Sequence, residues 1–176
     1  TLLTGMGLDP LPVTSGSKGI HLYASLPGEQ TSAEVSAVVK ELARIIENDH
    51  PDLATSVMSK AVRGGKVFLD WSQNNGKKTT ISPYSLRGRA RPGVAAPRTW
   101  EELDDPGLAH LELDDVLARA AAGFDPLSSL RPDAPALAAN APASPALSIA
   151  STGIMVRKMP MNSLATSCIG AHENSL

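Results

Sequence analysis

Apolar residues in the first part of the chain recur at the spacing of an amphipathic helix. Thr31 and Glu34 match a capping box, in which each side chain accepts a hydrogen bond from the backbone of the other residue. Apolar residues then follow at helical spacing from Val35 to Ile46. The pattern predicts a helix of about four turns with one apolar stripe.

Three further helices are predicted from capping residues. They are a last helical turn at 1–6 capped by Gly7, a short helix that follows a capping box of Thr99 and Glu102 and stops at Pro106, and a helix at 115–122 capped by Asp114 and ended by Gly123.

Two segments, 20–25 and 66–71, have the pattern of strands. In the second, Phe68 and Asp70 share one face, and both faces are largely apolar, which is typical of a central strand. A carboxylate is unusual in such a strand, because burying it is unfavourable unless it is paired or bound to a metal.

Asn74 to Gly76 predicts a hairpin turn, because Asn-Gly accepts the positive φ that such turns require. The segment 79–81 would then be the returning strand. Strands and helices alternate along the chain, so the fold class is α+β or α/β.

Composition changes sharply near residue 130. The segment 131–176 contains five charged side chains and is interrupted by five prolines, and its Ala-Pro runs have neither a helical nor a strand period. We therefore expect a domain over 1–130, followed by an Ala/Pro-rich disordered tail.

Overall charge excludes one class of function and leaves the others open. The chain of 176 residues has a net charge of −2, which excludes a strongly basic protein that binds nucleic acid by bulk charge. A single cysteine, Cys168, excludes an internal disulfide and a cysteine-based zinc site.

No apolar run has the length of a membrane-spanning helix, so we expect no membrane partner and an intracellular location. The chain opens on Thr1 rather than Met, from which we expect a processed or truncated product.

The segment Thr14 to His21 is the first candidate site. Two glycines free the backbone to turn its N–H groups toward an anion, while Ser15, Ser17, Lys18 and His21 add donors and positive charge. These features suit a polyphosphate. The alternative is an ordinary surface turn, because the segment is not a Walker motif.

The second candidate site follows the first in sequence and combines Arg63, Lys66, Asp70 and Gln73. Asp70 is either a metal ligand or a buried carboxylate that accepts hydrogen bonds from Ser72 or from the backbone. The Gly-Gly turn between Arg63 and Lys66 suits a nucleic-acid backbone, or is a solvated hairpin.

A third cluster holds five cations in a short stretch: Lys77, Lys78, Arg87, Arg89 and Arg91. Arginine forks pair with phosphate through two hydrogen bonds. The alternative is a solvated face. Local positive charge on a nearly neutral chain favours a specific groove over bulk polyanion binding.

Four segments in order resemble one family closely. They are 14–23, 65–74, 82–89 and 96–103, and over residues 1–130 the chain resembles the polymerase/primase domain of bacterial DNA ligase D, in the archaeo-eukaryotic primase superfamily. The resemblance implies an α+β fold with a mixed or antiparallel sheet and flanking helices. It implies nucleotide addition at DNA ends during non-homologous end joining, in a cytoplasmic, nucleoid-associated bacterial protein.

The same resemblance implies partners and residue roles. Family members use two divalent metals, Mn²⁺ or Mg²⁺, and act with Ku and with ligase and phosphoesterase domains on DNA ends that carry a 5′-phosphate. By resemblance, Asp70 is a metal ligand and a catalytic residue together with His21. The resemblance also makes Ser15, Ser17, Lys18, Gln73 and Arg87 contacts to an NTP or dNTP, and Arg63 and Lys66 contacts to DNA.

One departure from the family pattern changes the expected activity. The family's first two metal aspartates form an Asp-x-Asp pair well upstream of the Ser-Gly-Ser-Lys segment, and Asp9 is the only acid before Ser15 here. One carboxylate cannot hold two adjacent dications. We therefore expect the C-terminal part of a polymerase domain that is inactive or nearly so alone. The alternatives are a non-catalytic nucleotide- or DNA-end-binding remnant and a misfolded or unexpressed product.

Overall fold

The computed structural model describes residues 2–26, 29–130 and 152–157. Its elements are α1 (Leu2–Gly5), β1 (Leu11–Thr14), β2 (Gly19–Ala24), α2 (Ser32–Asp49), β3 (Ala54–Thr55), η1 (Lys60–Val62), β4 (Val67–Asp70), η2 (Trp71–Asn74), α3 (Trp100–Leu103), α4 (Leu113–Ala121), η3 (Ser128–Leu130) and β5 (Thr152–Arg157), where η denotes a 3₁₀ helix.

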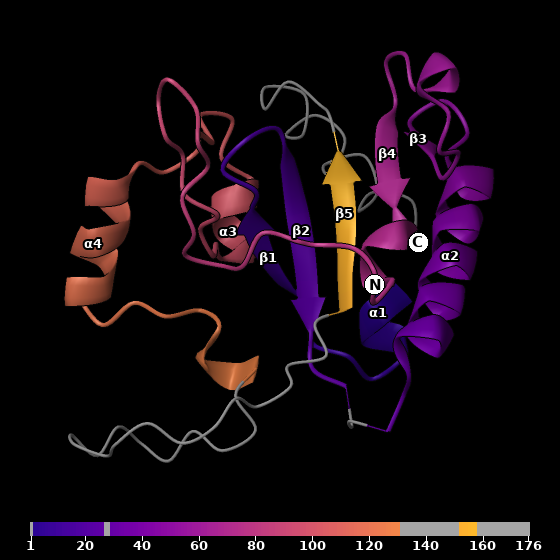
Figure 1. Cartoon of the computed structure of the whole chain (residues 1–176), viewed down its shortest axis with the longest axis horizontal. Coiled ribbons are helices and arrows are strands. Elements are labelled where there is room, and N and C mark those ends of the chain that lie inside the picture. Colours follow the sequence, from indigo (N-terminus) through magenta and orange to yellow (C-terminus); the bar gives the residue numbers. More distant parts are fainter. Residues whose placement is uncertain (1, 27–28, 131–151, 158–176) are drawn as a thin grey trace, which may run out of the picture.

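One five-stranded sheet organises the described chain. Its order is β1-β2-β5-β4-β3, and every neighbouring pair is antiparallel except β3 and β4, which are parallel. Figure 1 shows α2 beside the β3–β4 side of the sheet and α4 at the opposite end. The mixed sheet with helices around it confirms the predicted α+β class.

Helix α2 covers one face of this sheet. Val39 and Leu42 pack with Leu22 of β2, and Ala43 packs with Leu69 of β4. Because successive side chains in a strand point to opposite faces, the neighbours of Leu22 and Leu69 along their strands face away from α2. The other face therefore carries the two strand positions expected to do chemistry, His21 and Asp70.

Both predicted capping boxes are present. Thr31 and Glu34 form the predicted box at the start of α2, and Thr99 and Glu102 form the predicted box at the start of α3. Helix α1 ends ahead of Gly7, whose φ is +78°. The predicted stripe on α2 is narrower than expected, because two of its positions, Val38 and Ile45, are exposed.

Helix α4 begins earlier than predicted. Its N-cap is Glu112 rather than Asp114, and the Glu112 backbone N–H donates to Asp115 Oδ2 at 3.1 Å. The carboxylate three residues after the true cap satisfies a donor that an intrahelical carbonyl cannot reach. Gly123 follows the helix with φ +75°.

The predicted hairpin after β4 is wrong. After Asp70 the chain enters η2, and 79–81 form no strand. Both edges of β4 are already paired, one with β3 and the other with β5, so a returning strand has no edge to join. Trp71 also anchors the chain on the α2 side, where its indole N–H donates to the Ser56 carbonyl at 3.1 Å.

The segment predicted as a disordered tail contains a strand. Residues 152–157 form β5, the middle strand of the sheet, whereas the rest of 131–176 lies outside the described residues. The boundary at residue 130 between domain and tail stays a prediction. In the described ranges, no helix combines the length and the hydropathy needed to cross a membrane.

Candidate nucleotide-binding site

A tight loop between β1 and β2 holds the serine- and lysine-bearing segment. The Ser15 N–H donates to the Gly19 carbonyl at 2.8 Å, and the Gly19 N–H donates to Ser15 Oγ at 3.1 Å. Gly16 has φ +66°, a conformation that residues with a Cβ adopt rarely. The loop is therefore closed by the positive φ of Gly16 and by the hydrogen bonds between Ser15 and Gly19. Ser15 is buried within it.

Two arginines from a distant segment brace the same loop. Arg87 Nε donates to the Ser15 carbonyl at 3.1 Å, and Arg89 Nη2 donates to Ser17 Oγ at 2.6 Å. The Gly93 backbone also presses against Gly16 so closely that a Cβ built on Gly16 would lie 2.8 Å from the Gly93 carbonyl oxygen. Contacts with Arg87, Arg89 and Gly93 thus hold the loop in addition to its own hydrogen bonds.

The loop forms one wall of a cavity of about 460 Å³. Its lining residues are Ser15, Ser17, Lys18, Gly19, Lys60, Arg63, Gly64, Lys66, Phe68, Arg87 and Arg89. Six of these described lining residues are cations and none is acidic, so the cavity concentrates positive charge in a chain whose net charge is −2. Such a site attracts an anion that carries several charges.

Six predicted site residues line this one cavity: Ser15, Ser17, Lys18, Arg63, Lys66 and Arg87. Two further lining residues were missed by the sequence analysis, Lys60 and Phe68. Phe68 had a usable signal, because strand alternation places it on the face of Asp70. Lys60 lies in η1 and had none.

Arg63 and Lys66 are held in place on the far wall. The Arg63 guanidinium carbon lies 3.4 Å from the centre of the Phe68 ring, and its Nε donates to the Val57 carbonyl at 3.3 Å. Lys66 Nζ donates to the Pro51 carbonyl at 2.5 Å. The stacking and carbonyl contacts thus hold both side chains at the cavity edge.

Asp70 is buried at the end of β4, and hydrogen bonds reach both of its carboxylate oxygens. Ser72 Oγ donates to Oδ1 at 2.6 Å and Gln73 Nε2 donates to Oδ2 at 2.8 Å, while Lys78 Nζ donates to Ser72 Oγ. Gln73 is therefore seen as a partner of Asp70. The structure contains the Ser72 contact that the non-metal alternative expected, and the metal role of Asp70 stays a prediction.

The described residues fit a divalent metal only in part. Asp70 can supply one hard oxygen ligand, of the type that Mn²⁺ and Mg²⁺ prefer. In the ranges that the structure describes, however, no three His, Cys, Asp or Glu side chains gather as a metal-binding group. The described residues alone therefore do not make a two-metal site.

His21 is fully buried in β2, with Tyr23 beside it. His21 Nδ1 lies 3.3 Å from the Tyr23 hydroxyl, which donates to the Ile81 carbonyl at 3.3 Å. Burial raises the pKa of Tyr23 to about 12, so the phenol keeps its proton. Because that proton is directed to Ile81, the network favours the tautomer in which Nδ1–H donates to Tyr23.

Sheet register relates His21 and Asp70 to the cavity. Both residues pair with position 155 of β5, and the cavity residues Gly19 and Phe68 both pair with position 157. Residues directly opposite one another in neighbouring strands share a face, and two residues along a strand span about 7 Å. His21 and Asp70 therefore lie on the cavity side of the sheet, about 7 Å along their strands from its floor.

The basic cluster at 77–91 does not form one surface. Arg87 and Arg89 reach the cavity, whereas Lys77 lines a separate groove beside α2 and Arg91 pairs with Glu112 at 3.6 Å on an exposed surface. Lys77, Lys78 and Arg91 are exposed and lie outside the cavity lining, which agrees with the solvated-face alternative for these three residues. Charge density in the sequence did not reveal this division.

His110 lies beside the loop between β1 and β2. It is half-buried and hydrogen-bonds to the Ser17 backbone, whereas His50 is exposed. Burial lowers the pKa of His110, and the nearby Arg98 and Arg89 lower it further, while the Ser17 hydrogen bond opposes them. The lowered pKa favours a neutral imidazole beside the Ser15–Gly19 loop.

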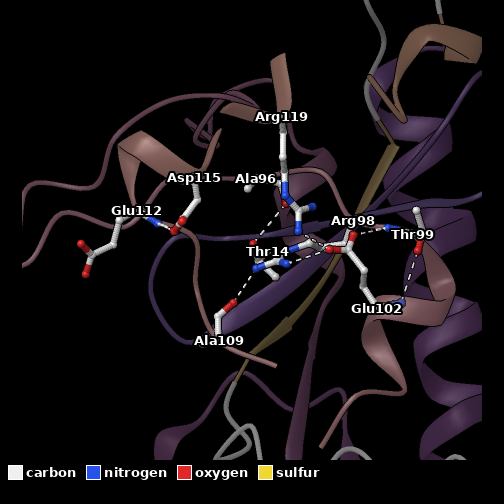
Figure 2. A network of polar contacts seen from close by, with 9 residues as sticks. All are labelled: Thr14, Ala96, Arg98, Thr99, Glu102, Ala109, Glu112, Asp115 and Arg119. Carbon is white, nitrogen blue, oxygen red and sulfur yellow. Dashed lines mark hydrogen bonds and ion pairs between the residues drawn. The ribbon is translucent and has the colours of Figure 1, made fainter. Parts of the chain in front are cut away.

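An ion-pair network fixes the segment that follows the two bracing arginines. Arg98 is buried and contacts Glu102 Oε1 at 3.0 Å and the Ala109 carbonyl at 2.5 Å, and Arg119 contacts the same Glu102 oxygen at 2.6 Å (Figure 2). The Thr14 N–H and hydroxyl both donate to the Ala96 carbonyl. These contacts tie the segment to β1 at the base of the loop.

Comparisons with known proteins match the part of the chain that contains the cavity. The family described as "LigD, primase-polymerase domain" matches residues 1–127. A multifunctional non-homologous end joining protein LigD from Mycobacterium bovis is 55% identical over 134 residues, covering 76% of this chain and 18% of the relative. A bifunctional relative from Bacillus subtilis is 38% identical over 122 residues, covering 67% of this chain and 20% of the relative.

A solved structure shows the same fold. The polymerase domain from Mycobacterium tuberculosis ligase D in complex with DNA matches with a TM-score of 0.73 and 55% identity, covering 76% of this chain and 47% of that domain. The chain thus spans about half of the solved domain and about a fifth of the curated relatives. On this match and on the family match over most of its length, the chain belongs to the LigD primase-polymerase family of DNA repair proteins.

Proposed function

We propose that the cavity binds the triphosphate of an NTP or dNTP for nucleotide addition at DNA ends in non-homologous end joining. The observation that carries this proposal is the cavity itself: six cations and the Ser15–Gly19 loop surround it, and none of its described lining residues is acidic. A triphosphate needs many donors around concentrated negative charge. Membership of the family and the polymerase activity that it implies support the same ligand.

Individual residues have distinct parts in this proposal. Lys18, which lines the cavity from the loop, supplies a mobile charge. Arg87 faces the cavity while its Nε holds the Ser15 carbonyl, so it both binds phosphate and fixes the loop. His21 and Asp70 lie beyond the cavity floor, where the reacting phosphate and the primer hydroxyl would meet.

The far wall of the cavity suits a DNA strand. Arg63 and Lys66 present charge at its edge without an acidic partner among the described lining residues. We propose that they contact phosphates of the primer strand, next to the bound triphosphate. The solved relative in complex with DNA supports a DNA partner. The other proposed partners are the 5′-phosphate of the DNA end, Ku, and ligase and phosphoesterase domains.

The metal requirement limits what this chain does alone. The family is metal-dependent, and bound Mn²⁺ or Mg²⁺ would neutralise phosphate charge and align the primer hydroxyl. Asp70 would supply one ligand. We propose that residues 1–176 alone bind nucleotide and DNA ends with little or no turnover. A second candidate, a non-catalytic binding remnant, is favoured because the described residues form a cationic cavity but include no group of three His, Cys, Asp or Glu side chains that could hold a metal.

Arg87→Gln tests the binding proposal against a matched arginine. The substitution removes one charge-assisted contact, typically 1.5–3 kcal/mol, so ATP affinity is expected to fall by about 10- to 150-fold. Arg91→Gln removes the same charge from an exposed position and is expected to change affinity by less than about 2-fold. Calorimetric titration of the 176-residue chain with ATP measures both, and equal losses in the two variants would contradict the assignment of the cavity.

The same samples separate the two candidate functions. Mn²⁺-dependent nucleotide addition is measured on a duplex with a 3′-overhang, with the 176-residue chain at a concentration that saturates ATP binding. Binding without extension is the expected result for either candidate. Addition of the segments that complete the solved domain should then restore extension for the polymerase and leave the remnant inactive. Robust extension by residues 1–176 alone would refute the proposed lack of turnover.

A further inference from the structure

The middle strand of the sheet comes from a segment far from its neighbours in sequence. β5 pairs along all six of its residues with β2, from Gly19–Arg157 to Ala24–Thr152, and with Phe68 to Asp70 of β4 on its other edge (Figure 1). Both pairings are antiparallel, so β2 and β4 run parallel to one another on either side of it. β5 is therefore the element that connects the two halves of the described sheet.

Removing β5 would leave two separate pairs of strands, β1 with β2 and β3 with β4. A two-stranded unit is marginally stable in water. Two facing rows of backbone N–H and C=O groups would also lose their partners. A gap with these properties accepts an extended strand in the way that an open sheet edge does.

We propose that the gap between β2 and β4 is a strand-accepting site, occupied by residues 152–157 of this chain. Register supports this occupant. Positions 154 and 156 pair with Leu22, Ile20 and Leu69, on the face that α2 covers, and the sequence has Ile and Val at those two positions. A slip by one residue would move both positions to the other face and place Gly153, Met155 and Arg157 on the side of α2, where glycine and a charged residue pack less well, so the sequence favours this register.

Occupancy of the gap also sets the geometry of the site. His21 and Asp70 lie directly across β5 from one another, because both pair with position 155. Two strand spacings separate them, which is about 10 Å. The inserted strand therefore fixes how far apart these two side chains are held. This inference does not depend on nucleotide binding.

A disulfide scan tests the register in the intact chain. In a Cys168→Ser background, Leu22→Cys with Ile154→Cys places two thiols directly opposite one another, and oxidation is expected to link them. Leu22→Cys with Met155→Cys is the control, because position 155 pairs with His21 and lies on the other face. Mass spectrometry of the oxidised chains measures both. No link in the first pair, or equal links in both, would overturn the proposal.

Complementation in trans tests whether the gap accepts a strand. Ile154→Pro with Val156→Pro removes two backbone donors and the extended pairing, whereas Ile154→Val with Val156→Ile keeps β-branched residues at both positions. Amide hydrogen exchange is expected to lose protection in β2 and β4 of the proline variant alone. A synthetic peptide of residues 150–159 should restore that protection and bind the proline variant at least 10-fold more tightly than the control. Unchanged protection, or no peptide binding, would overturn the proposal.

Discussion

Gly16→Ala is expected to lower the free energy of unfolding by about 3 kcal/mol or more and to abolish measurable ATP binding. A left-handed backbone conformation alone costs an alanine about 1–2 kcal/mol. The added Cβ would also lie 2.8 Å from the Gly93 carbonyl oxygen and 2.9 Å from the Val94 carbonyl carbon. Backbone atoms cannot rotate away as a side chain can, so the loop that carries Ser15, Ser17 and Lys18 must shift.

Gly7→Ala is the matched control for this substitution. Gly7 has φ +78°, similar to the +66° of Gly16, but a Cβ there would meet nothing within 4 Å. It should therefore lose only the conformational term and retain ATP binding. Urea unfolding and ATP titration of both variants separate backbone conformation from close approach. Equal losses of stability would show that the contact with Gly93 contributes nothing.

Glu102→Gln is expected to destabilise the fold by about 3 kcal/mol, because it leaves the buried Arg98 without its ionic partner. The Arg98 side chain is 5% exposed and the Glu102 side chain 25% exposed. Glu41→Gln is the control, because Glu41 and Arg44 are 62% and 60% exposed and such pairs contribute less than about 1 kcal/mol. Urea unfolding of the two variants at pH 7 measures the difference, and similar losses would contradict the role of the network.

The same network predicts a pH dependence. Partial burial by itself would raise the pKa of Glu102, but hydrogen bonds from Arg119, the Thr99 backbone and Arg98 outweigh it and hold the pKa at about 2. The unfolded chain has the ordinary value of 4.5, so this stabilisation is complete above pH 4.5 and is lost as the pH falls toward 2. Glu102→Gln should remove this part of the acid sensitivity, and an unchanged acid profile would contradict the assignment.

Local signals in the sequence predicted local structure well. The capping boxes at Thr31 and Thr99 contain their own partners within three residues, so they form wherever the helix begins. Strand alternation correctly placed Phe68 and Asp70 on a face opposite the one that packs on α2. The glycine- and serine-rich loop was likewise identifiable, since its hydrogen bonds join residues only four positions apart.

Long-range pairing could not be predicted in the same way. The residues Asn74 to Gly76 have the composition of a hairpin turn, but no hairpin forms because both edges of β4 are paired with other strands. One of these strands, β5, lies more than eighty residues later in the chain. The cavity also depends on long-range contacts, because Arg87 and Ser15 meet across 72 residues. The resemblance to a known family associated Arg87 with the Ser15 segment, whereas nothing in the sequence analysis predicted the pairing of β4 with β5.

The location of bound ATP tests the central claim most directly. Amide chemical shifts of the ¹⁵N-labelled 176-residue chain are followed during titration with ATP. We expect the largest changes at Ser15–Gly19, with further changes around Arg63–Lys66 and Arg87–Arg89, because these residues enclose the cationic cavity. A second groove of about 470 Å³, lined by Lys40, Trp71 and Lys77, should be unaffected. Changes confined to that groove, with the Ser15–Gly19 amides unmoved, would contradict the account.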